Sequence, residues 1–307
     1  MSQTPAISAT GVAKRQAARR KPFNTDRVLS ILVISPSVIL IGIFIYSFLI
    51  RTAYVSLVNW NDLKPTWEWR GLVNYVRLFD KQRFQIDLGN TLIFTVAFII
   101  VCVVVGLLLA SLLDSRIKGE AVFRAIFMFP LAVSFIVTGV AWRWLESPNS
   151  GINLLLGTVG FGWYTDPKIG ILGIVVPAVW QISGYVMAMY IAGLRGISED
   201  LREAARVDGA TEWDIFRHVL LPLLHPVTLS VVIILGHISL RIFDLVVAMS
   251  GSQPGFITDV PALYMWETTF LGSHFSEGAA IAMVMLVLVS MLIVPYLIYN
   301  ARNEVQQ

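Results

Sequence analysis

Charged residues are scarce in this 307-residue chain. Only 14% of its residues are Asp, Glu, Lys or Arg, whereas 56% are hydrophobic and the mean hydropathy is +0.71. Soluble domains carry about 25% charged residues, so this chain has too few charges to cover a surface that faces water. The composition excludes an ordinary soluble fold and indicates an integral membrane protein.

Cysteine and nucleotide-binding motifs are also missing. The single cysteine, Cys102, lies in an apolar run, which excludes a disulfide framework and any Cys-based zinc or iron–sulfur site. No G-x-x-x-x-G-K-[S/T] phosphate loop occurs, and no catalytic cluster is visible. We therefore expect a chain without enzymatic activity of its own and without a bound cofactor.

Long apolar runs are what the sequence does contain. A membrane-spanning helix needs about 20 mostly apolar residues. Six runs meet that length, at residues 29–50, 91–113, 123–145, 169–194, 227–249 and 279–299. The predicted fold class is therefore an all-α membrane protein with six transmembrane helices, formed by residues 28–302 as a single domain.

The distribution of lysine and arginine predicts the orientation of these helices. With the N-terminus in the cytoplasm, 14 of the 23 Lys and Arg residues fall on the cytoplasmic side and eight outside. Arg241 is left within the fifth run. Because cytoplasmic loops are enriched in basic residues, we expect both termini to be cytoplasmic, with residues 1–27 as a basic, disordered tail.

One predicted cytoplasmic loop, residues 198–222, has a strong helical pattern. Ser198 is a good N-cap for a first helix, which Gly209 would end in a left-handed conformation. Thr211 and Asp214 have the spacing of a capping box for a second helix, which we expect to end at Pro222. By itself this pattern fits a surface hairpin that only links two spans, or equally a docking surface for a soluble partner.

The residues of this loop resemble those of a known family. Glu203-Ala204-Ala205, then Asp208-Gly209-Ala210, and later Leu221-Pro222 are similar to the EAA loop of ABC importer permeases. Over roughly residues 28–300, the chain also resembles the carbohydrate-uptake (MalF/UgpA-like) permeases. The turn Ser250-Gly251-Ser252-Gln253-Pro254-Gly255 departs from the Thr-x-Gly-Gly-Pro that many of these permeases carry.

The resemblance implies a type I ABC importer permease fold and an inner-membrane location. It implies that a coupling helix docks on a separate ATPase subunit, with ATP and Mg bound there and not here. The residues it assigns to coupling are Glu203, Ala204, Ala205, Asp208, Gly209 and Ala210. The implied partners are a second permease subunit, two ATPase subunits, a periplasmic solute-binding protein and a sugar-type solute.

Polar residues inside the apolar runs are the candidates for solute contact. Ionisable groups at membrane depth are costly and usually functional. The candidate residues are Gln181, Tyr185, His237, Ser239, Arg241 and Asp244. Helical spacing would place His237, Arg241 and Asp244 on one face. Arg241 either pairs structurally with Asp244 or faces the pathway, where it would favour an anionic sugar derivative.

A different class of transporter also fits a six-span membrane protein. An ion-coupled secondary transporter would work without an ATPase, and it predicts an inverted repeat with discontinuous helices. The sequence shows no internal repeat. The binding-protein-dependent importer therefore remains the leading interpretation, and the sequence does not identify the sugar.

Overall fold

A computed structural model describes residues 25–114 and 118–304 of the chain. Its contacts divide the chain into two units, residues 1–50 and 51–307. In the first unit, α1 (Thr25–Ile41) continues through the π-helical turn η1 (Gly42–Tyr46) into α2 (Ser47–Ser56), whose residues from Arg51 on belong to the second unit. Residues Leu29–Ser56 form a helix long and apolar enough to cross a membrane. The predicted tail lies mostly outside the described residues.

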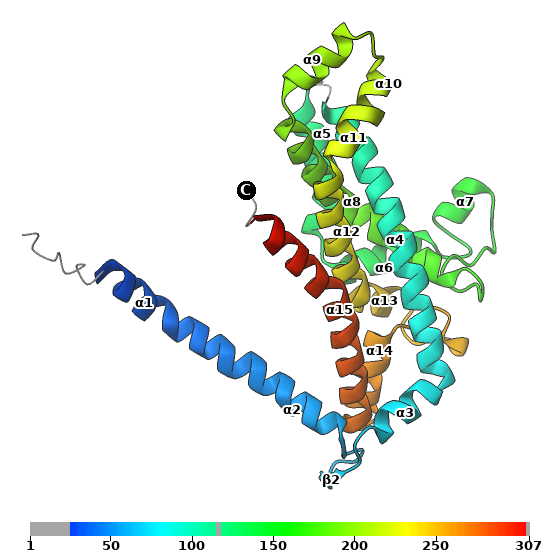
Figure 1. The fold of residues 1–307 in the computed structure, drawn as a ribbon. Coiled ribbons are helices and arrows are strands. Elements are labelled where there is room, and N and C mark those ends of the chain that lie inside the picture. The colour runs from blue at the N-terminus through cyan, green and yellow to red at the C-terminus, as the bar shows by residue number, and fades with distance from the viewer. Residues whose placement is uncertain (1–24, 115–117, 305–307) are drawn as a thin grey trace, which may run out of the picture. The chain divides into compact units, whose positions relative to one another are not determined.

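The second unit contains all the other elements (Figure 1). They are β1 (Val58–Asn59), β2 (Glu68–Trp69), α3 (Val73–Asp80), α4 (Gln82–Asp114), α5 (Glu120–Met128), η2 (Phe129–Ala132), α6 (Phe135–Leu145), α7 (Ile152–Leu156), α8 (Gly170–Gly196), α9 (Glu199–Val207), α10 (Glu212–Ile215), η3 (Phe216–Leu220), α11 (Leu221–Leu223), α12 (His225–Leu240), α13 (Asp244–Met249), η4 (Pro254–Phe256), α14 (Pro261–Trp266), η5 (Glu267–Leu271) and α15 (Phe275–Glu304). Helices α9 and α10 lie at one end of this unit, here the α9 end. Helix α3 and the antiparallel β1–β2 hairpin lie at the other, the α3 end.

The predicted spans correspond to helices of two kinds. Besides the first, three helices are continuous and long enough to cross a membrane: Gln82–Asp114, Gly170–Gly196 and Phe275–Ile298. Two further spans are formed only by bent pairs of helices, with a bend of 98° between Glu120–Ala132 and Phe135–Leu145 and of 64° between Glu212–Leu223 and His225–Leu240. The number of spans in the described residues is four, or six when each bent pair counts as one.

Proline lies at both bends. Pro130 is the second residue of the short 3-10 helix η2, just before the first bend, and Pro222 and Pro226 lie on either side of the second bend. A proline lacks the backbone N–H that would continue the hydrogen-bond ladder, so a helix is easily interrupted there. The expectation that the second loop helix ends at Pro222 is nearly met, because α11 ends one residue later, at Leu223.

The fifth predicted run, residues 227–249, is not one helix. Helix α12 ends at Leu240, and α13 begins only at Asp244 after three non-helical residues. The prediction that His237, Arg241 and Asp244 share one helical face is therefore wrong, because the helical spacing is interrupted between them. Arg241 and Asp244 instead border the break.

The core of the second unit is centred on the contact between α4 and α8. Phe94, Phe98 and Cys102 of α4 are fully buried, as are Val186 and Tyr190 of α8. Gly106 allows this close approach, since a Cβ atom placed there would lie 2.4 Å from Val186 Cγ1. Helices α4 and α8 are thus joined over several turns by apolar packing.

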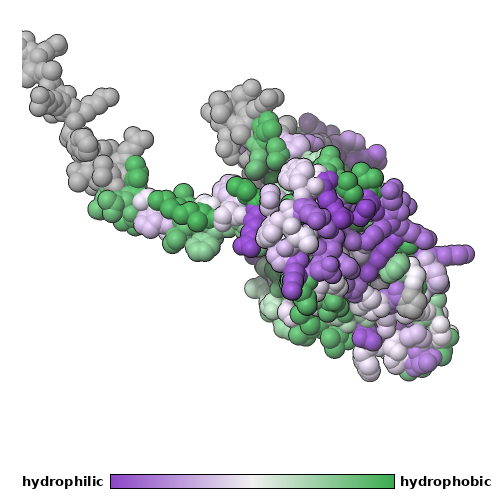
Figure 2. All heavy atoms as spheres, turned by 90° about the horizontal axis from the view of Figure 1, so that it is seen from below, coloured by the Kyte–Doolittle hydropathy of each residue, from purple (hydrophilic) through white to green (hydrophobic). Residues whose placement is uncertain are grey.

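The surface at the α3 end is polar in its middle. Seen from that end, hydrophilic side chains gather over the centre, and apolar side chains lie beside them (Figure 2). Apolar side chains also cover much of the outward surface of α4, where Leu92, Val104 and Leu112 are at least half exposed. This distribution fits a bundle whose sides contact lipid and whose ends contact water.

Candidate functional site

The 198–222 loop folds locally as its sequence predicts. The Ser198 hydroxyl accepts a hydrogen bond from the Asp200 N–H at 3.3 Å and begins α9. Gly209 ends the turn after α9 with φ of +84°, a conformation that costs a glycine little. Thr211 and Asp214 form the predicted capping box at the start of α10, with bonds of 3.1 and 3.2 Å. The loop is two short helices joined by a glycine turn.

The residues predicted for coupling divide by exposure. Glu203, Ala204, Asp208 and Gly209 are exposed, so they form a surface at the α9 end. Ala205 and Ala210 are half-buried and pack against the core. Only the four exposed residues are therefore free to contact a partner.

Two of the six residues predicted for solute contact are used within the protein. The Gln181 side-chain amide donates to the Val133 carbonyl at 2.6 Å, at the bend before α6. The fully buried Ser239 hydroxyl donates to the Gly236 carbonyl of its own helix at 2.9 Å. Only the Gln181 amide oxygen, buried and without a hydrogen-bond partner in the described structure, remains available.

The other four are accessible to different degrees. Arg241 and Asp244 are exposed at the break between α12 and α13, whereas Tyr185 and His237 are half-buried. His237 Nδ1 is buried without a hydrogen-bond partner among the described residues, and Arg241 lies within electrostatic range of the ring. No ion pair joins Arg241 to Asp244, although both are described. The interpretation that they pair structurally is therefore not supported.

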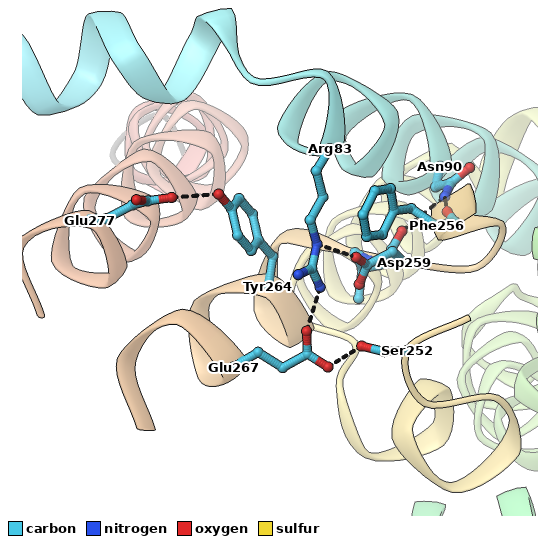
Figure 3. Close-up of polar contacts among 9 residues, drawn as sticks. Arg83, Asn90, Ser252, Phe256, Asp259, Tyr264, Glu267 and Glu277 are labelled. Atoms are coloured by element: carbon cyan, nitrogen blue, oxygen red, sulfur yellow. Dashed lines mark hydrogen bonds and ion pairs between the residues drawn. The ribbon is translucent and has the colours of Figure 1, made fainter. Parts of the chain in front are cut away.

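A polar cluster that the sequence did not reveal lies at the α3 end (Figure 3). The Arg83 guanidinium donates to Asp259 Oδ2 and to Glu267 Oε2, each at 2.6 Å. It also lies over the rings of Phe256 and Tyr264, 4.8 and 4.4 Å from their centroids. We call these five residues the Arg83 cluster. It joins α4 to the 250–271 loop through charge-assisted hydrogen bonds and cation–π contacts.

Two neighbours on the same face of α4 extend this cluster. The Asn90 amide donates to the carbonyls of Phe256 and Asp259, at 3.0 and 2.9 Å. Asp87 is fully buried beside Asp259, and its two carboxylate oxygens have no hydrogen-bond partner in the described structure. Burial raises the pKa of Asp259 above its ordinary value, and the hydrogen bond from Arg83 opposes that rise.

A further buried carboxylate, that of Glu146, lies just after α6. Glu146 is 1% exposed, and both of its carboxylate oxygens are buried without a hydrogen-bond partner in the described residues. Burial raises its pKa to about 8. Unlike Asp259, it forms no ion pair with an arginine in the part of the chain that the structure describes.

The sequence held a weak signal for the Arg83 cluster and none for Glu146. Arg83, Asp87 and Asn90 are spaced four and three residues apart just before an apolar run, which places three polar groups on one helical face. Their partners in the 250–271 loop are about 170 residues away, so no local pattern connects them. Within the described ranges, no group of three or more His, Cys, Asp or Glu side chains is arranged to hold a metal ion.

Comparisons with known proteins agree on one family. Residues 103–303 match the family model described as the binding-protein-dependent transport system inner membrane component. A probable ABC transporter permease of Pyrococcus horikoshii is 37% identical over 93% of this chain and 99% of its own length. The xylose/arabinose import permease XacH of Haloferax volcanii is 32% identical over 92% of this chain and 90% of its own.

Solved structures give the same fold. A chain in the crystal structure of a bacterial ABC transporter involved in the import of the acidic polysaccharide alginate matches with a TM-score of 0.73. The match covers 87% of this chain and 94% of that one, at 22% sequence identity. At that identity the likeness establishes the fold alone, which is that of ABC importer permeases.

Proposed function

Because the chain belongs to the family of binding-protein-dependent transport system inner membrane components, we propose that it is the permease subunit of an ATP-driven importer of a sugar or sugar derivative. It would form half of the translocation pathway, with a second permease subunit forming the other half. Two ATPase subunits would bind and hydrolyse ATP, and a periplasmic binding protein would deliver the solute. This chain would supply neither a nucleotide site nor a catalytic residue.

The observation that carries the proposal is the exposed surface of the 198–222 loop. Glu203, Ala204, Asp208 and Gly209 lie on a capped helix and its turn, at one end of a bundle whose sides are apolar. A short helix with small and acidic exposed residues suits a groove on a soluble subunit. We therefore place the ATPase contact at the α9 end, on the cytoplasmic side, with both chain termini on the same side.

The sugar class rests on relatives and on the polar groups in the bundle. The names of similar permeases include xylose/arabinose and trehalose/maltose. Tyr185, His237, Arg241 and Asp244 are the accessible polar side chains that we propose line this chain's half of the pathway. An exposed arginine that has no acidic partner among the described residues favours a solute that carries a carboxylate or phosphate, since the guanidinium fork matches both.

The proposal is tested by reconstituting the chain in lipid vesicles with the second permease subunit, the ATPase subunits and the periplasmic binding protein. We expect uptake only with ATP and all four components. Uptake by this chain alone, driven by an ion gradient without ATP, would instead establish an ion-coupled secondary transporter. The interrupted helices described above also fit that alternative, but the family to which the chain belongs is that of binding-protein-dependent permeases.

The role of Arg241 is tested in the same vesicles. A thermal-shift screen of the binding protein against neutral and acidic sugars first identifies a solute. Arg241→Gln should then lower uptake of an acidic sugar at least tenfold while leaving a neutral one within twofold. If Arg241→Gln retained the uptake of both sugars equally, Arg241 would not belong to the solute site. The assignment as a permease would be unaffected.

A further inference from the structure

One arginine connects the exposed helix α9 to two long helices of the bundle. Arg202 donates from Nη1 to Asp114 Oδ2 at 2.7 Å and from Nη2 to the Leu194 carbonyl at 3.1 Å. Asp114 is the last residue of α4, and Leu194 lies in the last turn of α8. One planar guanidinium thus contacts three helices.

The position of this contact distinguishes it from the surface ion pairs around it. The side chains of Arg202 and Asp114 are each 14% exposed. Arg206 and Glu212, which join α9 to α10, are 44% and 75% exposed. Exposed pairs contribute about 0–1 kcal/mol, whereas a buried charge that loses its partner is costly. Arg202 is therefore the charged contact of α9 that is both sheltered and directed to the bundle.

Helix α9 has little else to fix it to the spans. None of its residues is buried, and its apolar contribution to the core is the half-buried Ala205. The Leu194 carbonyl, in the last turn of α8, accepts the Ile197 N–H at 3.3 Å, which is a long backbone hydrogen bond. Arg202 donates a second hydrogen bond to the same carbonyl and ties it to the end of α4.

We propose that Arg202 is a positioning residue that makes α9 move as one body with the ends of α4 and α8. This inference rests on the proposed function, because it gives α9 the role of receiving motion from an ATPase subunit. Helices α4 and α8 pack against each other along the core. A displacement of α9 therefore shifts both helices and is not absorbed by bending of the loop. The exposed face with Glu203 and Ala204 contacts the partner, and the opposite face carries Arg202.

The test measures the distance between α9 and α4 directly. Spin labels are placed at exposed Val207 of α9 and exposed Val104 of α4, with the buried Cys102 replaced by alanine. The complete transporter is studied with and without ATP-Mg and vanadate by pulsed electron resonance. In the otherwise unmodified chain, we expect the distribution of the distance between the two labels to be narrow and the same in both states. In Arg202→Gln, the width of this distribution should increase at least twofold.

Three variants keep the result specific to the geometry. Arg206→Gln removes a surface pair of the same helix and should leave the distribution narrow. Arg202→Lys keeps the charge but cannot reach both acceptors, because an ammonium lacks the guanidinium fork, so an intermediate width is expected. The exchange Arg202→Asp with Asp114→Arg should narrow the distribution again relative to Arg202→Gln.

Two outcomes would contradict two different claims, the role of Arg202 and the proposed function. A distribution in Arg202→Gln as narrow as in the unmodified chain, in both states, would overturn the inference. Failure of ATPase subunits to co-purify with the unmodified chain would instead refute the proposed function. In that case the nucleotide-free distances would still report whether Arg202 fixes α9.

Discussion

The two ends of the second unit differ in whether their charged side chains are exposed or buried. At the α9 end, Glu203 and Asp208 are exposed, and most ion pairs lie at the surface. At the α3 end, Asp259 and Asp87 are almost completely buried, and Arg83 is enclosed by two acids and two aromatic rings. An exposed charge remains available to a partner, whereas an enclosed charge fixes the segments that enclose it.

This difference agrees with what each end connects. Within the 198–222 loop, α9 has no buried residue, and Arg202 is its sheltered charged contact with the bundle, whereas Ile215 and Leu220 further along the loop are buried in the core. The 250–271 loop is fixed to α4 at two levels, by Arg83 and two turns later by Asn90. A loop that is fixed at several points keeps its shape against its helix. A helix such as α9, which is fixed mainly through one side chain, can transmit a displacement at that point.

Removing the arginine at the α3 end should have the largest effect. Arg83→Met keeps most of the side-chain volume but leaves Asp259, 1% exposed, without its counterion. Breaking a buried pair in this way costs about 3–5 kcal/mol. Denaturant titration in detergent micelles should show this loss of unfolding free energy.

Lys81 provides the matched control for Arg83. It also pairs with an acid, Glu277 at 2.5 Å, but its side chain is 45% exposed. Lys81→Met should cost no more than about 1 kcal/mol. Similar losses in the two variants would contradict the view that the Arg83 cluster is enclosed.

Glu146 shows what a buried carboxylate does without an arginine. Its pKa is raised from 4.5 to about 8, so the folded state prefers the protonated form. Stability is therefore full below the unfolded-state pKa and is lost as the pH rises through the folded-state value. Between about pH 5 and 8, each pH unit should cost about 1.4 kcal/mol from this group.

Glu146→Gln removes the titrating group while keeping its shape. The variant should lose the part of the pH dependence that Glu146 contributes over this range, and it should exceed the unmodified chain in unfolding temperature at pH 8 but not at pH 5. Thermal unfolding at several pH values measures both. An unchanged pH profile would show that water or another group compensates Glu146.

Charge reversal at the α9 end should affect binding and not stability. Glu203→Arg changes an exposed group, so the unfolding free energy should stay within about 0.5 kcal/mol. Affinity for the ATPase subunits should fall about tenfold, equal to about 1.4 kcal/mol. Lys64→Glu, an exposed reversal at the α3 end, is the control and should leave that affinity unchanged. Equal affinities of the unmodified chain and both variants for the ATPase subunits would show that Glu203 is not part of the ATPase contact.

The smallest expected effect concerns the turn after α9. Gly209 has φ of +84° and open space where a Cβ would lie, so Gly209→Ala adds backbone strain and no clash. It should cost about 1 kcal/mol. Gly209→Asn should cost less, because asparagine tolerates the left-handed region better. Unfolding measurements that rank the two variants in the reverse order would show that side-chain contacts dominate at this turn.

Much of the architecture could be predicted from the sequence, because its signals are local. Apolar runs of about 20 residues located the spans, and Ser198, Gly209 and Thr211 predicted both helices of the 198–222 loop. The same local reasoning failed at residues 241–243. Their run is apolar on both sides, yet the helix breaks there, and nothing in the neighbouring residues accounts for the break.

The sequence by itself determined that this chain is a membrane protein with few charges, and that its EAA-like loop is a capped pair of helices. Hydropathy and capping act within a few residues, so they can be read along the chain. Only the tertiary structure decided which charges are exposed. It separated Arg241 from Asp244, joined Arg83 to Asp259 and Glu267, and placed Arg202 against the ends of α4 and α8. Burial and pairing depend on segments that lie far apart in the sequence, and they decide whether a charge holds the fold or meets a partner.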